Sequence, residues 1–361
     1  FINSKGVIMK KELLIASALT ASLGLAGVAE AATASFSGNV RNGVKGVDTD
    51  GTADGTYGSN QKASLSFSVS ETTDGGVQIS TGFNVQDEGT NDLGDANGLS
   101  LTFTDGSKLD LIEAGNAYAT HTASVPGASG EQGLTGLTAN SAPTGLNFAD
   151  ASDNVGFEYH SAADGFGIEG LKWGLSAAFG DDGDGASSST AETSYSVGVS
   201  YVTSAGDTTV TVGGGVLSAS DSNATTANDK ADEVSMALTA ATGNLTLGVG
   251  YSSGSFVKSA TAASTSVEVD GAEVMTAGAK YVSGDITMAV GYADGEAKDT
   301  ATFGDAGSNT DAHDSMSASV DYAVAAGVTA TIGYTSVDSS DEAAADTGNS
   351  GSSWYIGANV S

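Results

Sequence analysis

The chain has 361 residues, and its formal net charge of −32 comes from 44 acidic and only 12 basic side chains. A nucleic-acid-binding protein needs a basic face, so this charge argues against that class. The sequence has no cysteine, which excludes thiol catalysis and cysteine-ligated zinc. Its 51 glycines occur with only two prolines, which is not the mixture typical of disordered chains.

Residues 1–31 have the pattern of a secretory signal peptide preceded by a few upstream residues. A pair of lysines follows Met9, the expected initiator, and an apolar segment rich in Ala and Leu occupies residues 13–28. A small-x-small motif ends at Ala31, so cleavage there and a mature barrel over residues 32–361 are expected. The alternative is an N-terminal membrane anchor, which the cleavage motif and the short apolar segment disfavour.

Beyond residue 31 the hydrophobic pattern has a period of two. In residues 62–69, for example, Ala, Leu, Phe and Val alternate with Lys and Ser. Such alternation predicts strands with one apolar and one polar face. In chain order, the predicted strands lie at 35–45, 62–69, 77–85, 99–103, 108–115, 153–161, 171–179, 195–201, 210–216, 234–238, 245–251, 275–281, 286–292, 316–322, 328–334 and 352–361.

Short and long connections alternate between these strands. Short turns are predicted at 72–76, 104–107, 204–207, 242–244, 282–285 and 325–327, and long polar loops at 46–60, 86–97, 181–193, 220–233, 252–266, 293–314 and 338–351. This order indicates an up-and-down meander with short turns at one end and long loops at the other. The count of about sixteen strands is even, as in bacterial outer-membrane barrels.

A membrane barrel explains the two faces better than a soluble sandwich does. Sixteen strands with a buried apolar face would need a second layer, and the sequence has no helical pattern to supply one. If the apolar face contacts lipid, the polar face lines a water-filled lumen and no second layer is needed. The predicted fold is therefore all-β, a transmembrane antiparallel up-and-down barrel of about sixteen strands.

The charged and aromatic residues agree with this assignment. A Lys or Arg on the lipid face near the midplane would cost roughly 2–4 kcal/mol. The cations of clearly alternating strands fall on the polar face instead: Arg41, Lys45, Lys62, Lys108, Lys172 and Lys280. Tyrosines near strand ends fall on the apolar face, as in an aromatic girdle, with ordinary β propensity as the alternative. These are Tyr201, Tyr251, Tyr281, Tyr292, Tyr322 and Tyr334.

Residues 116–152 interrupt the meander, because the segment is too long for an ordinary connection, lacks alternation and contains both prolines. On either side of it the sequence resembles Gram-negative porins, most closely the general porins of α-proteobacteria. The matching pieces are SFSGNVRNGVKG, ASLSFSVSETTDGGVQISTGFNVQDE, GSKLDLIEAGNA, DNVGFEYHS and WYIGANVS. The resemblance covers the whole predicted mature chain. It also implies a homotrimer and a terminal aromatic residue, so a Phe after Ser361 is expected.

The resemblance implies that 116–152 is a third loop that folds into the barrel and narrows the pore. In that family, acidic residues on the loop face a basic cluster on the wall. The acidic candidates are Glu113, Glu131, Asp150 and Asp153, and the basic candidates are Arg41, Lys62 and Lys108. The single arginine of this chain departs from the several that such porins usually carry at the constriction. With acidic loops unbalanced, a preference for cations is expected. The alternative is that loop acidity serves only solubility.

Other chemical signals are weaker. Asp181, Asp182 and Asp184 lie in a GDDGDG segment that resembles a calcium loop without the helices of an EF-hand, so a looser Ca²⁺ site and a solvated acidic loop are both open. The histidines at 121, 160 and 313 have no metal-ligand spacing, and His160 is expected to line the pore. No Ser-His-Asp set can be assigned.

These patterns predict a pore in the outer membrane of a Gram-negative bacterium. Small hydrophilic solutes and ions would diffuse through it passively, with no chemical step, no required cofactor and no nucleic-acid partner. One alternative is a non-conducting structural or adhesive barrel in the same membrane. Another is an outer-membrane enzyme, which would need a serine beside an ordered histidine.

Overall fold

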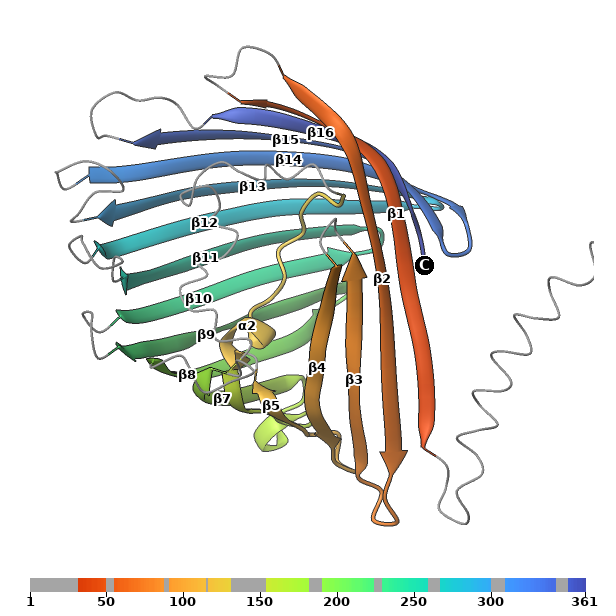
Figure 1. The fold of residues 1–361 in the computed structure, drawn as a ribbon, viewed down its shortest axis with the longest axis vertical. Helices are drawn as coiled ribbons and strands as arrows, with labels where there is room; N and C mark the ends of the chain where they lie inside the picture. Colours follow the sequence, from red (N-terminus) through yellow and green to blue (C-terminus); the bar gives the residue numbers. More distant parts are fainter. Residues whose placement is uncertain are drawn as a thin grey trace, which may run out of the picture.

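The computed structural model describes residues 32–49, 55–87, 91–114, 116–130, 154–181, 190–223, 229–258, 267–299, 309–341 and 350–361. Within these residues the chain forms sixteen strands, one short α-helix and one turn of 3-10 helix. Each strand pairs antiparallel with its neighbours in sequence, and β1 pairs with β16, which closes the sheet into a barrel (Figure 1). The predicted fold is confirmed.

The elements follow one another around the ring in chain order. Their bounds are β1 Thr33–Thr49, β2 Thr56–Thr72, β3 Gln78–Asp87, β4 Asn91–Thr102, β5 Lys108–Ala114, α2 Ala117–His121, β6 Asn154–His160, the 3-10 turn Gly165–Gly167, β7 Leu171–Asp181, β8 Thr190–Ala205, β9 Thr208–Asn223, β10 Asp229–Thr242, β11 Leu245–Lys258, β12 Val267–Ser283, β13 Ile286–Asp299, β14 Asn309–Ala325, β15 Val328–Asp341 and β16 Gly351–Val360.

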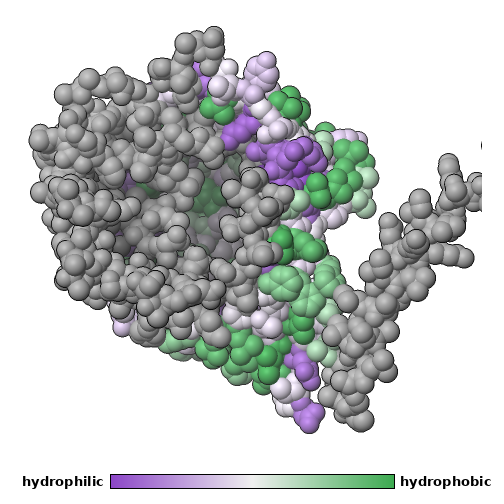
Figure 2. Space-filling view, viewed as in Figure 1, coloured by the Kyte–Doolittle hydropathy of each residue, from purple (hydrophilic) through white to green (hydrophobic). Residues whose placement is uncertain are grey.

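The two faces of the wall differ as the alternation predicts. In β8, Val197 and Val199 are about half exposed on the outer face, whereas Ser194 and Ser196 are buried on the inner face. Hydrophobic residues gather on the outer surface where β1 and β2 lie (Figure 2). Lipid shields the large apolar side chains of the outer face from water, as a protein core would. The sheet therefore needs no second layer to cover this face.

The predicted cations lie on the lumenal face. Val40 and Val44 on β1 are 48% and 45% exposed on the outer face, so Arg41 and Lys45 lie on the opposite face. The tyrosines predicted for the girdle share the face of the exposed valines. Five of them are exposed on the outside of the wall: Tyr201, Tyr281, Tyr292, Tyr322 and Tyr334.

Lipid contact at Ile332 gives a direct test of the two faces. Ile332 on β15 is 59% exposed on the outer face, so Ile332→Arg should lower the free energy of unfolding in lipid vesicles by about 2–4 kcal/mol. Thr335→Arg, on the lumenal face of the same strand, is the matched control and should change it far less. Equal losses for the two variants in urea titrations would contradict the assignment of faces.

The strands are longer than predicted and the loops correspondingly shorter. The loop predicted at 86–97 is wrong, because residues 91–97 belong to β4. Likewise β13 runs to Asp299 and β14 starts at Asn309, inside the loop predicted at 293–314. About 9–11 residues cross the hydrocarbon, so strands of 14–17 residues continue into water. At 91–97, for example, the letters show no alternation of apolar and polar residues, while the hydrogen-bonded ladder to β3 persists.

The segment after β5 turns inward and contains a helix that the sequence pattern does not predict. The helix α2 lies inside the ring of strands (Figure 1). None of the helices in the described residues is long and apolar enough to cross a membrane. The predicted signal peptide over 1–31 and the remainder of the predicted constriction loop, 131–152, lie outside the described residues.

Candidate functional site

The described part of the predicted constriction loop, residues 116–130, lies against the inner wall of the barrel. Its helix α2 packs on β7, β8 and β9. Residues 125–127 then run close to glycines of β11, β12 and β13, and Ser129 reaches β14. The loop therefore crosses the inner wall from β7 to β14 and occupies part of the lumen.

Glycines line the wall beneath this path. A Cβ atom at Gly278 would overlap the carbonyl oxygen of Pro126, and one at Gly213 would overlap the carbonyl oxygen of His121. A Cβ atom at other wall glycines would also come within 2.6 Å of a loop atom: Gly198, Gly215 and Gly248. Because these positions carry no side chain, the backbones of loop and wall come into direct contact.

Hydroxyl groups of the wall satisfy the first N–H groups of α2. Its N-cap residue, Asn116, makes no side-chain capping bond. Instead, the N–H of Ala117 donates to Ser176 Oγ at 3.2 Å and that of Tyr118 donates to Ser196 Oγ at 3.3 Å. A five-residue helix is marginal in isolation, and its first N–H groups have no partner within the helix. The stability of α2 therefore depends on the wall.

Two further contacts fix the loop at separate points. The Tyr118 hydroxyl donates to Glu233 Oε2 on β10 at 2.9 Å, and the two residues are only 7% and 3% exposed. Burial, followed by the charge of Glu233, raises the pKa of Tyr118, so its hydroxyl stays a donor. Farther along, the N–H of Ser129 donates to Ser319 Oγ on β14 at 2.8 Å, and its hydroxyl donates to Asp321.

Two histidines meet where α2 faces β6. His121 Nε2 lies 3.2 Å from His160 Nδ1, and His121 Nδ1 lies 3.1 Å from Ser200 Oγ. On its other side, His160 Nε2 lies 3.0 Å from Glu158 Oε1. Burial, followed by the neighbouring His160, lowers the pKa of His121. Sequence spacing does not predict this contact, because closure of the loop onto the wall creates it.

The basic candidates for the constriction occupy two places. Arg41 and Lys62 are direct cross-strand neighbours on β1 and β2, and Arg41 Nε donates to Asn60 Oδ1 at 3.0 Å. Because β1 is half-way round the ring from β9, this pair lies on the wall opposite α2. Lys108 on β5 is separate from them and forms an ion pair with Asp110 at 3.0 Å.

The acidic candidates stay predictions. Glu113 belongs to β5, but its side chain lies outside the described residues, as do Glu131, Asp150 and Asp153. The predicted calcium site is also untested. Asp181 ends β7 and its side chain is not described, and Asp182 and Asp184 lie beyond the described range.

Exposed carboxylates lie in the strands near the ends that adjoin the long connections. They are Asp232, Glu273, Asp294, Glu296, Asp314 and Asp338, which we call the rim carboxylates. The Tyr292 hydroxyl donates to Asp314 Oδ1 at 2.8 Å, which ties two neighbouring strands at this rim. They share the face of the outward Met275, Tyr292 and Met316, so they lie on the outer side of the rim and give this end of the barrel a negative potential.

Several residues of the site were not identified from the sequence. Glu158 belongs to this group, although alternation along the predicted strand 153–161 places it on the same polar face as His160. The pairing of Tyr118 with Glu233 had no such signal, since the two residues are 115 positions apart and meet only through the inward path of the loop.

Comparison with known proteins agrees with this geometry. The sequence profile of Gram-negative porins matches residues 16–342. No curated protein is found that matches the sequence.

Solved structures with the same fold include OmpT of Vibrio cholerae in a trimer form, at 15% identity and a TM-score of 0.58, over 92% of this chain and 99% of that one. An anion-selective porin from Comamonas acidovorans has 14% identity and a TM-score of 0.60, over 91% and 99%. A mutant of the Rh. blastica porin has 14% identity and a TM-score of 0.55, over 91% and 99%.

At these identities the solved structures show a shared fold only. Membership of the family is shown by the match to its sequence profile. It covers most of the chain, and the barrel that it implies is closed, has a polar inner face and holds an inward loop. The chain belongs to the Gram-negative porin family and is a channel protein of the bacterial outer membrane.

Proposed function

We propose that the barrel is a passive diffusion pore for small hydrophilic solutes and ions, that it prefers cations and that it carries out no chemical step. The observation that supports passive diffusion is the inner wall. Its inward positions are mainly Ser, Thr and Gly, with a few charged groups, and the loop docks on one side of it. Such a surface keeps water in the lumen and offers weak contacts to many solutes.

The rim carboxylates support the cation preference. Inside the barrel, Arg41 and Lys62 are cationic and would favour anions, so the wall opposite α2 does not supply the preference. Carboxylates on the outer side of the rim attract cations and raise their local concentration near the mouth before entry. Selection in this proposal takes place at the rim.

A selection at the rim should weaken as salt is added. The Debye length falls from about 10 Å at 0.1 M to about 3 Å at 1 M ionic strength. Planar bilayers with a fixed KCl ratio across them should therefore give a reversal potential that indicates cation preference at low salt and moves towards zero at high salt. A cation preference of the same size at both concentrations would place the selection inside the pore instead.

The variant pair Glu273→Gln with Asp294→Asn should reduce the cation preference at low salt. Asp74→Asn is the matched control, because Asp74 is an exposed carboxylate in a short turn at the other end of the barrel. Glu131→Gln with Asp150→Asn tests the acidic candidates of the constriction loop. If only this last pair changes the reversal potential, the rim carboxylates are not the selective element.

We also propose a homotrimer, as the trimer form of the OmpT structure suggests for a barrel of this fold. Light scattering of the unheated protein in detergent should give the mass of three chains. The same bilayer recordings separate the pore from a structural or adhesive barrel, which would insert without conducting.

A further inference from the structure

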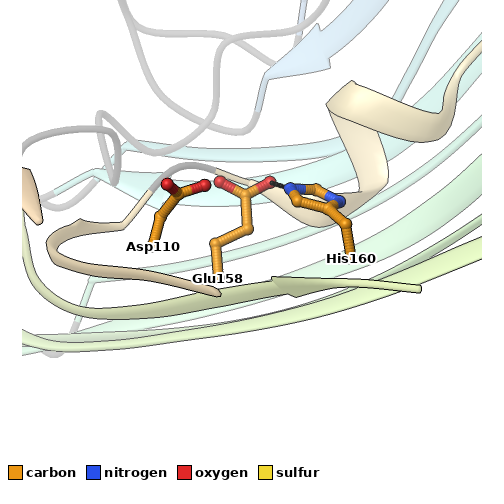
Figure 3. Close-up of side chains that lie close together, drawn as sticks. All are labelled: Asp110, Glu158 and His160. Carbon is orange, nitrogen blue, oxygen red and sulfur yellow. Dashed lines mark ion pairs between the residues drawn. The ribbon is translucent and has the colours of Figure 1, made fainter. Parts of the chain in front are cut away.

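One histidine and two carboxylates come together on the lumenal faces of β5 and β6, beside the loop helix. Asp110 lies directly across from Glu158 in the strand register, and His160 follows two residues later on the same face. One ligand atom from each residue lies within 4.8 Å of the other two. Figure 3 shows the two carboxylates side by side, with the His160 ring next to Glu158. Glu158 is only 6% exposed.

We propose that Asp110, Glu158 and His160 form a binding site for a divalent metal ion of the zinc class inside the pore. Zn²⁺ accepts imidazole nitrogen and carboxylate oxygen together, whereas Ca²⁺ and Mg²⁺ take oxygen ligands. Ligand atoms about 2.0–2.1 Å from a tetrahedral ion lie roughly 3.3 Å apart, so small side-chain rotations close the site. Three protein ligands leave a fourth position for water.

The hydrogen bonds around the three residues suit a metal site. A metal-bound imidazole is normally oriented by a partner at its other ring nitrogen. His160 directs Nε2 towards the carboxylates, while its Nδ1 lies 3.2 Å from His121 Nε2. His121 is held in turn by Ser200, 3.1 Å from Nδ1. This chain of contacts fixes the His160 ring with Nε2 facing Glu158, so that an ion bound at Nε2 would take the place of the direct contact with Glu158 Oε1.

The carboxylates have comparable support. Thr120 Oγ1 on α2 donates to Glu158 Oε1 at 3.0 Å. Asp110 receives a hydrogen bond from Ser100 and an ion pair from Lys108, both at Oδ1, which leaves Oδ2 to the ion. Lys108 is 46% exposed and can move away when a cation arrives.

A bound ion would connect the wall to the loop. Two of the ligand residues contact α2 through Thr120 and His121, so an ion would hold β5, β6 and the start of the loop together. Binding is read out without any current through the pore. A negative binding result would therefore leave the proposed diffusion function untouched, and a non-conducting barrel could still bind the ion.

The test is calorimetric titration of Zn²⁺ into the full barrel, folded in detergent and freed of metal by EDTA and dialysis. One ion per chain is expected, and Co²⁺ in place of Zn²⁺ should show the visible absorption of a four-coordinate site. His160→Gln and Glu158→Gln should each weaken binding at least tenfold. His313→Gln, which removes the histidine of β14, eight strands away around the ring, should leave it unchanged.

Folding of each variant is checked by heat-modifiable migration on gels. Asp110→Asn keeps the shape of a ligand residue and replaces His160→Gln if that variant does not fold. The proposal is overturned if the wild type binds no stoichiometric Zn²⁺. It is equally overturned if the folded His160→Gln or Asp110→Asn variant binds as tightly as the wild type, or if His313→Gln loses binding to the same extent.

Discussion

Gly278→Ala is expected to lower the single-channel conductance and to make the open current noisier. The new Cβ would overlap the carbonyl oxygen of Pro126, which belongs to the loop, so the loop has to move off the wall and towards the pore axis. Overpacking of this kind typically costs about 1–3 kcal/mol. The cost falls on the docked state of the loop, because β12 keeps its ladder bonds to β11 and β13.

Gly58→Ala is the matched control, because a Cβ atom at Gly58 on β2 would meet nothing within 4 Å. It adds the same methyl group to another strand of the barrel, away from the docked residues 116–130. If Gly278→Ala and Gly58→Ala both conduct like the wild type, the loop does not limit the current.

Tyr118→Phe should lower the free energy that holds the loop on the wall by roughly 1–3 kcal/mol. The reason is that the buried carboxylate of Glu233 loses the hydroxyl that donates to it. Glu233→Gln should have a smaller effect, since the amide oxygen can still accept from Tyr118. The two variants and their combination form a double-mutant cycle for the anchor. A combined loss equal to the sum of the single losses would exclude a coupling between the two side chains.

The loosening can be measured by thiol labelling. The chain has no cysteine, so Ala123→Cys introduces the only thiol, at a loop position that is 8% exposed. Labelling by a small methanethiosulfonate reagent should be slow in this background and faster once Tyr118→Phe is added. An unchanged labelling rate, with the barrel shown to be folded, would mean that Tyr118 does not hold the loop on the wall.

The barrel could be predicted from the sequence because the two faces of each strand contact different environments, lipid outside and water inside. In β8 the outward Val197 and Val199 contact lipid and the inward Ser194 and Ser196 do not, so a period of two is visible in the letters alone. The strand ends could not be predicted in this way. The letters at 91–97 show no alternation, and the hydrogen-bonded ladder with β3 rather than hydrophobicity defines them as strand.

The site could be predicted only in part. The inward loop was expected from family resemblance, and the lumenal placement of Arg41 and Lys62 followed from alternation. The contact of His121 with His160 did not, because it depends on the path of the loop across the wall. Wall glycines such as Gly278 allow that path because they have no side chain. The pattern of apolar and polar residues does not indicate which glycines have this role.

The hydrogen bond from Ser129 to Ser319 has a consequence for the order of assembly. The two residues are 190 positions apart in the chain. Ser319 belongs to β14, which only β15 and β16 follow in the strand order. Contacts of such high sequence separation form late, since the entropy of closing the intervening chain must first be overcome. The contact at Ser129 is therefore expected to form only after most of the strands have paired, so the loop takes its final place on the wall late in folding.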